Sequence, residues 1–174
     1  QRKVNFDVCY IDIDDFKPYN DYYGFEKGDN VIRRIGQLIV DIVQPGVSDR
    51  FRFVGHIGGD DFIVITRPHA SQQICRQIIA GLETLLPEFH GEQEVREGHY
   101  SARDRQGELR QFSLLSLSIG IVSTEESTVS SYAELAFLAS GVKRAAKQEK
   151  GSSIFRNRRV DVCTRVAQES GAAA

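Results

Sequence analysis

The chain has 174 residues, of which 41% are hydrophobic and 26% charged, and its formal net charge at pH 7 is −2. This length allows one domain with a substantial core, and the composition is that of a globular protein. The slightly negative charge argues against a general nucleic-acid-binding protein, which would carry a strong basic excess, so we expect no nucleic-acid partner.

The three cysteines, Cys9, Cys75 and Cys163, are scattered along the chain and form no CxxC pair. Such a set indicates buried, reduced thiols rather than a disulfide framework or a zinc site. The sequence shows no signal peptide and no apolar run long enough to span a bilayer. We therefore expect a cytoplasmic domain without membrane contact of its own, either free or as the cytoplasmic part of a larger, membrane-attached protein.

The first predicted strand is the apolar run at residues 8–11, which ends in a cluster of carboxylates. Strand alternation puts Asp12 and Asp14 on one face of this strand and Asp15 on the other. Residues 16–23 follow as a predicted short helix or turn, because the proline at its third position is tolerated in a first turn.

A helix and a hairpin come next. Residues 31–43 carry an apolar stripe with helical spacing, and Asp29 directly precedes it. Strand character returns in residues 51–57 and 62–66, on either side of the sequence Gly-Gly-Asp-Asp at residues 58–61. This pattern predicts a hairpin with an acidic tip, whose glycines supply positive φ angles and let an anion approach the backbone.

The second half of the chain continues the alternation of helix and strand. Residues 74–86 form an amphipathic pattern that Pro87 closes, and residues 92–122 have the pattern of a long hairpin. Within it, Gly120 sits in a core strand, where it permits close backbone packing. Residues 132–147 predict a last helix, and a closing strand follows at residues 153–155.

The paired carboxylates predict a metal site. Asp60 and Asp61 would repel each other by roughly 4 kcal/mol at ~4 Å unless a cation or a proton intervenes. If the first strand lies beside the hairpin, Asp12 and Asp60 can share an oxygen-only site, which suits Mg²⁺ or Mn²⁺ rather than zinc. Mg²⁺ usually takes its other ligands from water and substrate phosphates, so a nucleotide polyphosphate is indicated. Either cluster alone would favour a solvated turn; together, with Lys17 and Asn20 close behind, they favour function.

These motifs resemble a known family. Residues 12–21, Gly24, residues 28–29 and residues 58–62 are similar in order and spacing to the GGDEF domain of diguanylate cyclases. Such enzymes condense two GTP molecules into cyclic di-GMP and pyrophosphate. The resemblance implies an α/β fold with a mixed, mostly antiparallel central sheet flanked by helices, like the palm of nucleotide cyclases and polymerases, and the predicted elements agree with it.

The resemblance extends over nearly the whole chain and implies its organisation. We expect residues 1–156 to form a single domain that lacks the usual N-terminal turn motif of the family. Residues 157–174 would be a frayed or connecting tail.

The resemblance also implies metal ligands and catalytic carboxylates. The metal ligands would be Asp12, the carbonyl of Ile13, Asp60 and Asp61, with Mg²⁺ or Mn²⁺ as the cofactor. Asp60 and Asp61 would also be catalytic residues.

Further residues would bind the substrate. Lys17 and Lys147 would neutralise the phosphates and count as catalytic, whereas Asn20 and Asp29 would select guanine and residues 58–59 would lie against the substrate. Plainer roles stay open: Asn and Asp are common helix caps, and cations are favoured near a helix C-terminus.

The chain departs from the family pattern at several positions. Asp61 stands where active members usually have Glu, and residues 143–144 are Lys-Arg where Leu-Tyr is usual. Lys150 is a candidate for the second phosphate-binding cation of the family. The family's inhibitory Arg-x-x-Asp site has its charges reversed here, with Asp49 and Arg52, so we expect this site to be missing. The plainer role of Arg52 is a solvated strand edge.

We expect a diguanylate cyclase that binds GTP and works as a homodimer, with further signalling domains in the full-length bacterial protein. Asp61 and the altered residues 143–151 favour an alternative, a degenerate module that binds GTP and regulates an attached phosphodiesterase or sensor domain. A purely structural dimerisation module is the third possibility. The intact Asp12, Lys17, Asn20, Asp29 and Asp60 oppose the degenerate module. A purely structural module would leave the retention of every guanine and metal position unexplained.

Overall fold

The computed structural model describes residues 4–44, 51–103, 107–126, 129 and 131–157. No helix in these ranges is both long and apolar enough to cross a membrane. In chain order the elements are β1 (Asp7–Asp14), α1 (Phe16–Tyr23), α2 (Phe25–Val43), β2 (Phe53–Gly58), β3 (Asp61–Thr66), α3 (Pro68–His90), α4 (Glu92–Glu97), β4 (His99–Arg103), β5 (Leu109–Ser113), β6 (Ser116–Ser123), α5 (Tyr132–Ala146) and β7 (Ser153–Arg156).

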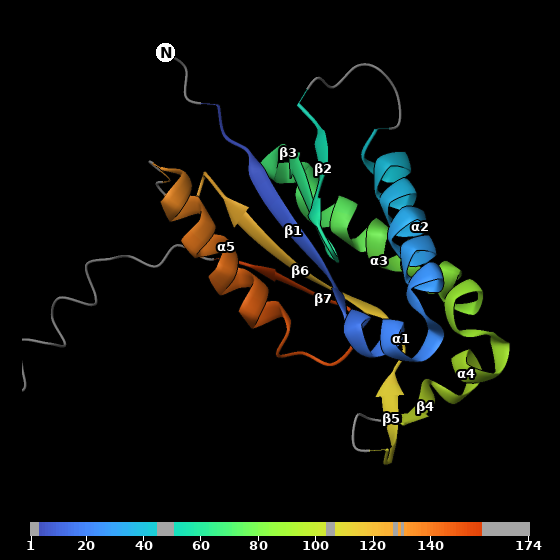
Figure 1. Cartoon of the computed structure of the whole chain (residues 1–174). Helices are drawn as coiled ribbons and strands as arrows, with labels where there is room; N and C mark the ends of the chain where they lie inside the picture. Colours follow the sequence, from blue (N-terminus) through green and yellow to red (C-terminus); the bar gives the residue numbers. More distant parts are fainter. Residues whose placement is uncertain (1–3, 45–50, 104–106, 127–128, 130, 158–174) are drawn as a thin grey trace, which may run out of the picture.

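The central sheet has the strand order β2-β3-β1-β6-β7 (Figure 1). Its β2–β3, β3–β1 and β1–β6 pairs are antiparallel, whereas β6 and β7 run parallel. Strands β4 and β5 form a separate two-stranded sheet. The predicted α/β fold with a mixed, mostly antiparallel sheet is therefore confirmed.

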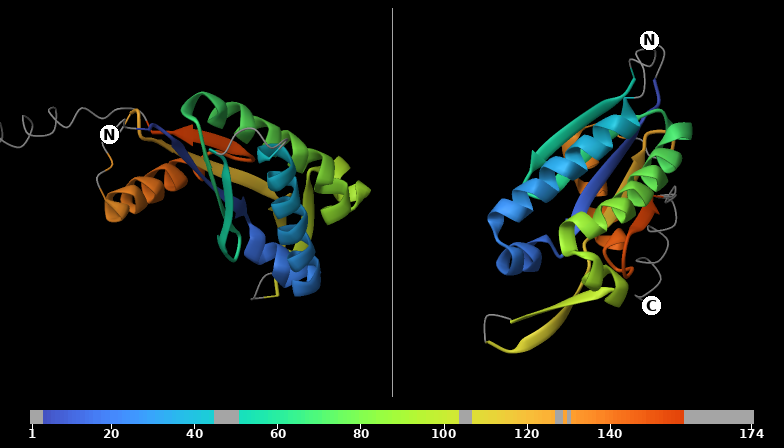
Figure 2. Two further views of the ribbon diagram at one scale, coloured as in Figure 1. Left: turned by 90° about the horizontal axis from the view of Figure 1, so that it is seen from above. Right: turned by 90° about the vertical axis from the view of Figure 1, so that its right-hand side faces the viewer.

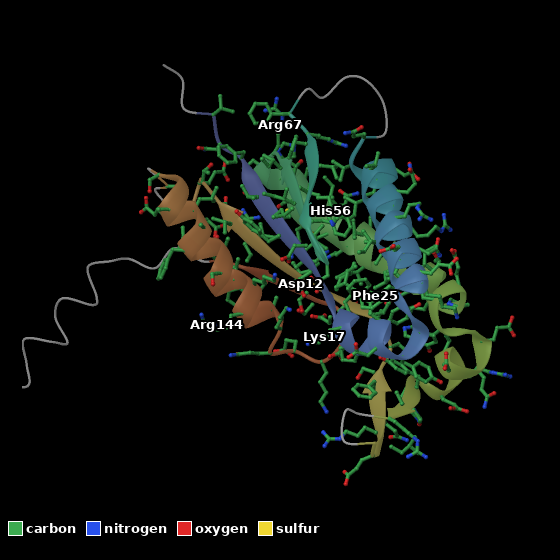
Figure 3. The ribbon with its side chains drawn as sticks, in the orientation of Figure 1. Asp12, Lys17, Phe25, His56, Arg67 and Arg144 are labelled. Atoms are coloured by element: carbon green, nitrogen blue, oxygen red, sulfur yellow. The ribbon has the colours of Figure 1, made fainter. Side chains whose placement is uncertain are left out.

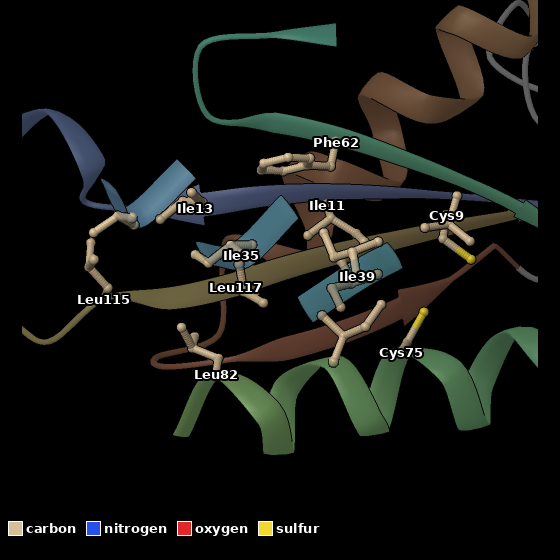
Figure 4. Close-up of a cluster of buried hydrophobic side chains, with 14 of the residues drawn as sticks. Cys9, Ile11, Ile13, Ile35, Ile39, Phe62, Cys75, Leu82, Leu115 and Leu117 are labelled. Atoms are coloured by element: carbon tan, nitrogen blue, oxygen red, sulfur yellow. The ribbon is translucent and has the colours of Figure 1, made fainter. Parts of the chain in front are cut away.

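Helices α2 and α3 lie on one face of the sheet and α5 on the other (Figures 1 and 2). Alternate residues of β1, namely Cys9, Ile11 and Ile13, point into the core that α2 and α3 cover (Figure 4). Both Cys9 and Cys75 are buried free thiols, as predicted, while Cys163 lies outside the described residues. The intervening residues of β1, including Asp12, therefore face α5.

Helix α5 packs closely on the sheet because the residue of β6 that faces it, Gly120, has no side chain. A β-carbon built on Gly120 would lie 2.6 Å from Val142 Cγ2 and 3.0 Å from the backbone nitrogen of Lys143. The predicted role of this glycine in close backbone packing is thus confirmed. The close approach brings the C-terminal half of α5, with Lys143, against the strand that neighbours β1.

Several predicted boundaries were wrong. Pro87 does not end the third helix but lies inside α3, which continues to His90. The long hairpin predicted for residues 92–122 is instead a short helix, α4, the small sheet β4–β5 and the separate core strand β6. Alternation and apolar content could not reveal this division, because β5 and β6 form one nearly continuous strand-like stretch in the sequence.

Candidate active site

The acidic end of β1 lies beside the hairpin of β2 and β3, as the sequence predicts. In the antiparallel register, Asp12 is paired with Asp61. The backbone N–H of Ile13 donates to the carbonyl oxygen of Asp60 at 3.2 Å, which fixes the hairpin tip on β1. The carboxylate that this register brings next to Asp12 is that of Asp61, whereas Asp60 occupies the turn itself.

The hairpin tip needs its two glycines for conformation rather than for space. Gly58 and Gly59 have φ angles of +137° and +60°, and a β-carbon on either would meet no atom within 4 Å. His56 Nε2–H donates to the carbonyl of Gly59 over 2.9 Å, and its ring stacks on Phe62. The predicted positive φ angles are confirmed, and the exposed backbone of the tip is open to an approaching anion.

Lys143 of α5 and Lys147, the C-cap residue of α5, neutralise the carboxylates. Lys143 Nζ lies 2.6 Å from Asp12 Oδ2 and 2.5 Å from Asp61 Oδ1. Lys147 Nζ lies 2.6 Å from Asp12 Oδ1. The side chain of Asp12 is only 3% exposed, so its charge depends on these partners. Burial opposes the charge of Lys143, but its hydrogen bonds to Asp12 and Asp61 outweigh that effect and raise the pKa of Lys143.

Lys143 is the member of this cluster that sequence reasoning missed. Its position differs from the family pattern, and its place near a helix end suggested only a favourable interaction with the helix dipole. A usable signal was present, because Lys143 and Lys147 are four residues apart and share one face of α5. Lys143, rather than the exposed Lys150, joins Lys147 at the carboxylates.

Asp14 shares the face of Asp12, as predicted, but it has other partners. Its carboxylate accepts hydrogen bonds from the hydroxyls of Ser116 and Ser118 at 2.8 and 2.7 Å. Burial raises the pKa of Asp14, and these two hydrogen bonds act in the opposite direction. Asp15, predicted on the opposite face, instead leaves the strand with a φ of 55°, which turns the chain into α1. Asp14 therefore supports the end of β1 against β6.

The side chain of Asn20 lies against Gly28, the residue that precedes Asp29. Asn20 lies in α1, and a β-carbon on Gly28 would come within 1.8 Å of Asn20 Oδ1. Asp29 is the next residue along α2 and is exposed. Neither residue is a helix cap, because both lie inside helices that begin at Phe16 and Phe25. The plainer role considered for them is wrong.

Lys17 is exposed in the first turn of α1, close to the end of β1 that carries Asp12 (Figure 3). In the described part of the chain, Lys17 therefore joins Lys143 and Lys147 at this end of the sheet. Its side chain is free to meet a phosphate group that approaches the hairpin tip.

Arg52 does not stand on a solvated strand edge, and that alternative is wrong. Its side chain is partly buried, and its Nη1 donates to the carbonyl of Val43 at 3.0 Å, where it closes the C-terminus of α2. Asp49 lies outside the described residues, so the missing inhibitory site stays a prediction.

The donor set fits Mg²⁺ or Mn²⁺. Within the described ranges, no three His, Cys, Asp or Glu side chains are grouped so that they could hold a metal ion. Asp12 and Asp61 nevertheless supply two adjacent carboxylates, and Mg²⁺ is typically held by one or two protein carboxylates together with water and substrate phosphates. The buried charge of Asp12 already attracts cations here, in the form of two ammonium groups.

Comparison with known families gives one clear match. The family model described as "Diguanylate cyclase, GGDEF domain" matches residues 1–153. Among curated proteins, the diguanylate cyclase DgcS of Shewanella oneidensis is 34% identical over 87 residues, which is 48% of this chain and 28% of DgcS. The diguanylate cyclase VdcA of Vibrio cholerae is 40% identical over 70 residues, or 40% of this chain and 19% of VdcA. The chain therefore matches less than a third of the length of these relatives.

Solved structures agree in fold. The isolated GGDEF domain of TpbB (YfiN) from Pseudomonas aeruginosa superposes with a TM-score of 0.60 at 26% identity, covering 95% of this chain and 83% of that one. The active GGEEF domain of a diguanylate cyclase from Vibrio cholerae gives a TM-score of 0.58 at 23% identity, with coverages of 88% and 85%.

Proposed function

The chain belongs to the GGDEF family of diguanylate cyclase domains, and we propose that it condenses two GTP molecules into cyclic di-GMP with release of two pyrophosphates. The observation that carries the proposal is the side-by-side placement of Asp12 and Asp61 at the glycine-bearing hairpin tip. Two carboxylates, three nearby lysines and an open backbone turn form a site suited to a polyphosphate and a divalent cation.

In this proposal Asp12, Asp61, Asp60 and the carbonyl of Ile13 hold Mg²⁺ or Mn²⁺. When bound, the metal would lower the cost of charge that develops on the phosphates and on the attacking oxygen. Asp12 and Asp61 are already adjacent in the register, and Asp60 is tied to Ile13 through its backbone.

The remaining residues bind and orient the nucleotide. Lys17 and Lys147 neutralise the triphosphate, and the backbone of residues 58–59 lies against it. Asn20 and Asp29 read the guanine edge, since an amide and a carboxylate can accept from the N–H groups of guanine and the amide can also donate. Gly28 leaves the space that the Asn20 side chain occupies, because a β-carbon there would lie 1.8 Å from Asn20 Oδ1.

The reaction requires two chains, because each supplies one nucleotide. The 3′-hydroxyl of one GTP attacks the α-phosphorus of the other, forms a P–O bond, loses its proton and expels pyrophosphate. The same exchange in the opposite direction closes the ring. We therefore propose a homodimer with facing sites in the cytoplasm, where GTP is available. Further signalling domains are proposed as well, since the relatives are much longer than this chain.

A second candidate function is favoured by the ion pairs of Lys143. Because its ammonium already neutralises Asp12 and Asp61, the domain could retain GTP and still lack turnover. In that case it would regulate an attached phosphodiesterase or sensor domain.

Incubation of the purified domain with GTP and Mg²⁺ or Mn²⁺ tests the proposal, with cyclic di-GMP and pyrophosphate followed by chromatography. A version fused to a dimerising coiled coil removes the dependence on protein concentration. The test variant is Asp60→Asn, and the matched control is Asp41→Asn, which removes an exposed carboxylate near the C-terminal end of α2.

We expect product from the wild type and from Asp41→Asn, and loss of product in Asp60→Asn. If the enforced dimer binds GTP in calorimetry but forms no product, the regulatory module replaces the cyclase as the function. If it binds no GTP at all, both candidate functions are wrong.

A further inference from the structure

The ammonium group of Lys143 lies between two carboxylates on adjacent strands. Its Nζ is 2.6 Å from Asp12 Oδ2 and 2.5 Å from Asp61 Oδ1. Both contacts come from one nitrogen, so this cation bridges β1 and β3 at the register pair Asp12–Asp61. Lys147 contacts the other oxygen of Asp12 and leaves Asp61 alone. Among the residues that the structure describes, Lys143 is therefore the cation that contacts both carboxylates.

The bridge is partly shielded from water. The side chain of Lys143 is 29% exposed, and those of Asp12 and Asp61 are 3% and 35% exposed. Screening by solvent is weak for such a pair, and separation of the charges would leave Asp12 buried without full compensation. The close approach of α5 over Gly120 holds the lysine at this depth.

A divalent cation at the same carboxylates needs the same space. Mg²⁺ binds carboxylate oxygens at about 2.0–2.1 Å, closer than the ammonium does. A metal ion that contacts Asp12 and Asp61 together would compete with the Lys143 ammonium for Asp12 Oδ2 and Asp61 Oδ1, and the two cations would repel each other at that separation. Binding of the metal is therefore opposed by the lysine as long as its ammonium stays on these two oxygens.

We propose that Lys143 is an internal competitor of the divalent metal, which occupies the carboxylate pair in the empty protein and must be displaced before Mg²⁺ or Mn²⁺ can bind. The inference rests on the proposed function only in taking Asp12 and Asp61 as metal ligands. Competition by Lys143 makes the protein's affinity for the free metal low, because only the fraction of molecules in which Lys143 is displaced can bind the metal. A metal ion that binds together with a nucleotide is also coordinated by the phosphates, and this additional binding energy would displace Lys143 from the carboxylates.

Mn²⁺ alone is the probe, with no nucleotide present. Free Mn²⁺ is measured by its electron paramagnetic resonance signal during titration of wild-type protein, Lys143→Gln and Lys143→Arg. Arg144→Gln is the matched control, since Arg144 is the adjacent residue of α5, carries the same charge and is exposed. We expect Lys143→Gln to bind Mn²⁺ about tenfold more tightly than the wild type. Arg144→Gln should change the affinity less than about twofold, and Lys143→Arg, which keeps the cation, should not gain affinity.

Lysine reactivity provides a second measurement on the wild type, in case Lys143→Gln does not fold. Acetylation by acetic anhydride is mapped by mass spectrometry with and without Mn²⁺. Lys143, once released from the carboxylates, should react faster in the presence of Mn²⁺. Lys27, whose ammonium lies 4.9 Å from the ring centroid of Tyr23, should react at an unchanged rate.

The proposal is overturned if Lys143→Gln binds Mn²⁺ no more tightly than the wild type, if Arg144→Gln gains equally, or if no variant binds Mn²⁺. Unchanged reactivity of Lys143 under Mn²⁺ saturation has the same consequence. Its failure can be told apart from failure of the proposed function. If Lys143→Gln binds Mn²⁺ more tightly but the wild type makes no cyclic di-GMP, Lys143 competes with the metal and the proposed cyclase activity is wrong. If the wild type makes cyclic di-GMP but Lys143→Gln gains no affinity for Mn²⁺, the cyclase stands and the competition by Lys143 is wrong.

Discussion

Gly28 lies directly against the side chain of Asn20, so that a β-carbon at Gly28 would come within 1.8 Å of Asn20 Oδ1. The substitution Gly28→Ala must therefore move the Asn20 amide away from its place at the proposed guanine site. We expect GTP affinity to fall about tenfold, the cost of roughly one good hydrogen bond. Calorimetry with GTP and with ATP measures the effect, and the preference for GTP should shrink.

Gly36 provides the control because it lies in the same helix, and a β-carbon built there would lie 3.4 Å from its nearest neighbour, Phe62 Cε1, at an ordinary van der Waals distance. Gly36→Ala should keep the GTP affinity and gain up to about 1 kcal/mol of helix stability. Equal losses of GTP affinity in both variants would disprove the link between Gly28 and base recognition.

Asp61→Glu restores the side chain that active family members usually carry. A reacting geometry that is wrong by about 1 Å can cost ~100-fold in rate, and one methylene group changes the carboxylate position by about that distance. We expect the rate of cyclic di-GMP formation to rise about tenfold or more, with Asp41→Glu as a control for the added methylene on the surface. A rate that stays the same or falls would mean that the length of this side chain is not limiting.

The sequence was most informative where local rules decide the structure. The glycine tip of the hairpin, the acidic end of β1 and the helix over residues 132–147 all follow from turn chemistry and periodicity, and the structure has them close to the predicted places. Adjacency of β1 and the hairpin was predicted only as a condition for a shared metal site, and it is confirmed.

The sequence could not predict which elements pack against one another in the tertiary structure. The sequence predicts close packing at Gly120, but it does not show that α5 is the element that packs there. Lys143 meets Asp12 and Asp61 where Gly120 lets α5 approach β6. Pro87 likewise reads as a helix end, yet α3 continues past it to His90, whose ring is held by contacts from other elements.

Gly120→Ala tests the close approach of α5. The new methyl group would lie 2.6 Å from Val142 Cγ2 and 3.0 Å from backbone atoms of α5, so the helix must move outward. We expect a loss of about 1–3 kcal/mol in the free energy of unfolding, measured by urea denaturation. Gly141→Ala is the control, because a β-carbon there meets nothing within 4 Å, and it should stabilise the helix slightly. A neutral Gly120→Ala would show that α5 does not depend on this contact.

His90 predicts how stability depends on pH. The backbone N–H of Leu115 donates to His90 Nε2 at 2.9 Å, so this nitrogen must be unprotonated. Nδ1–H can then donate to the hydroxyl oxygen of Tyr23 at 3.2 Å, while Tyr23 donates to Glu94 at 2.6 Å. The network needs a neutral imidazole. Burial, with a smaller contribution from Lys27, lowers the pKa of His90 to about 4 from its ordinary 6.5.

Because the folded protein holds His90 neutral and the unfolded chain does not, the unfolded state binds the extra proton first as the pH falls. This contribution to stability is complete above about pH 6.5 and declines progressively toward pH 4, by roughly 3 kcal/mol in total. Urea denaturation between pH 7.5 and 4.5 should therefore show a steeper loss of stability in the wild type than in His90→Gln, whose amide oxygen can still accept from Leu115 and does not titrate. Parallel pH profiles for the two proteins would contradict a neutral, buried His90.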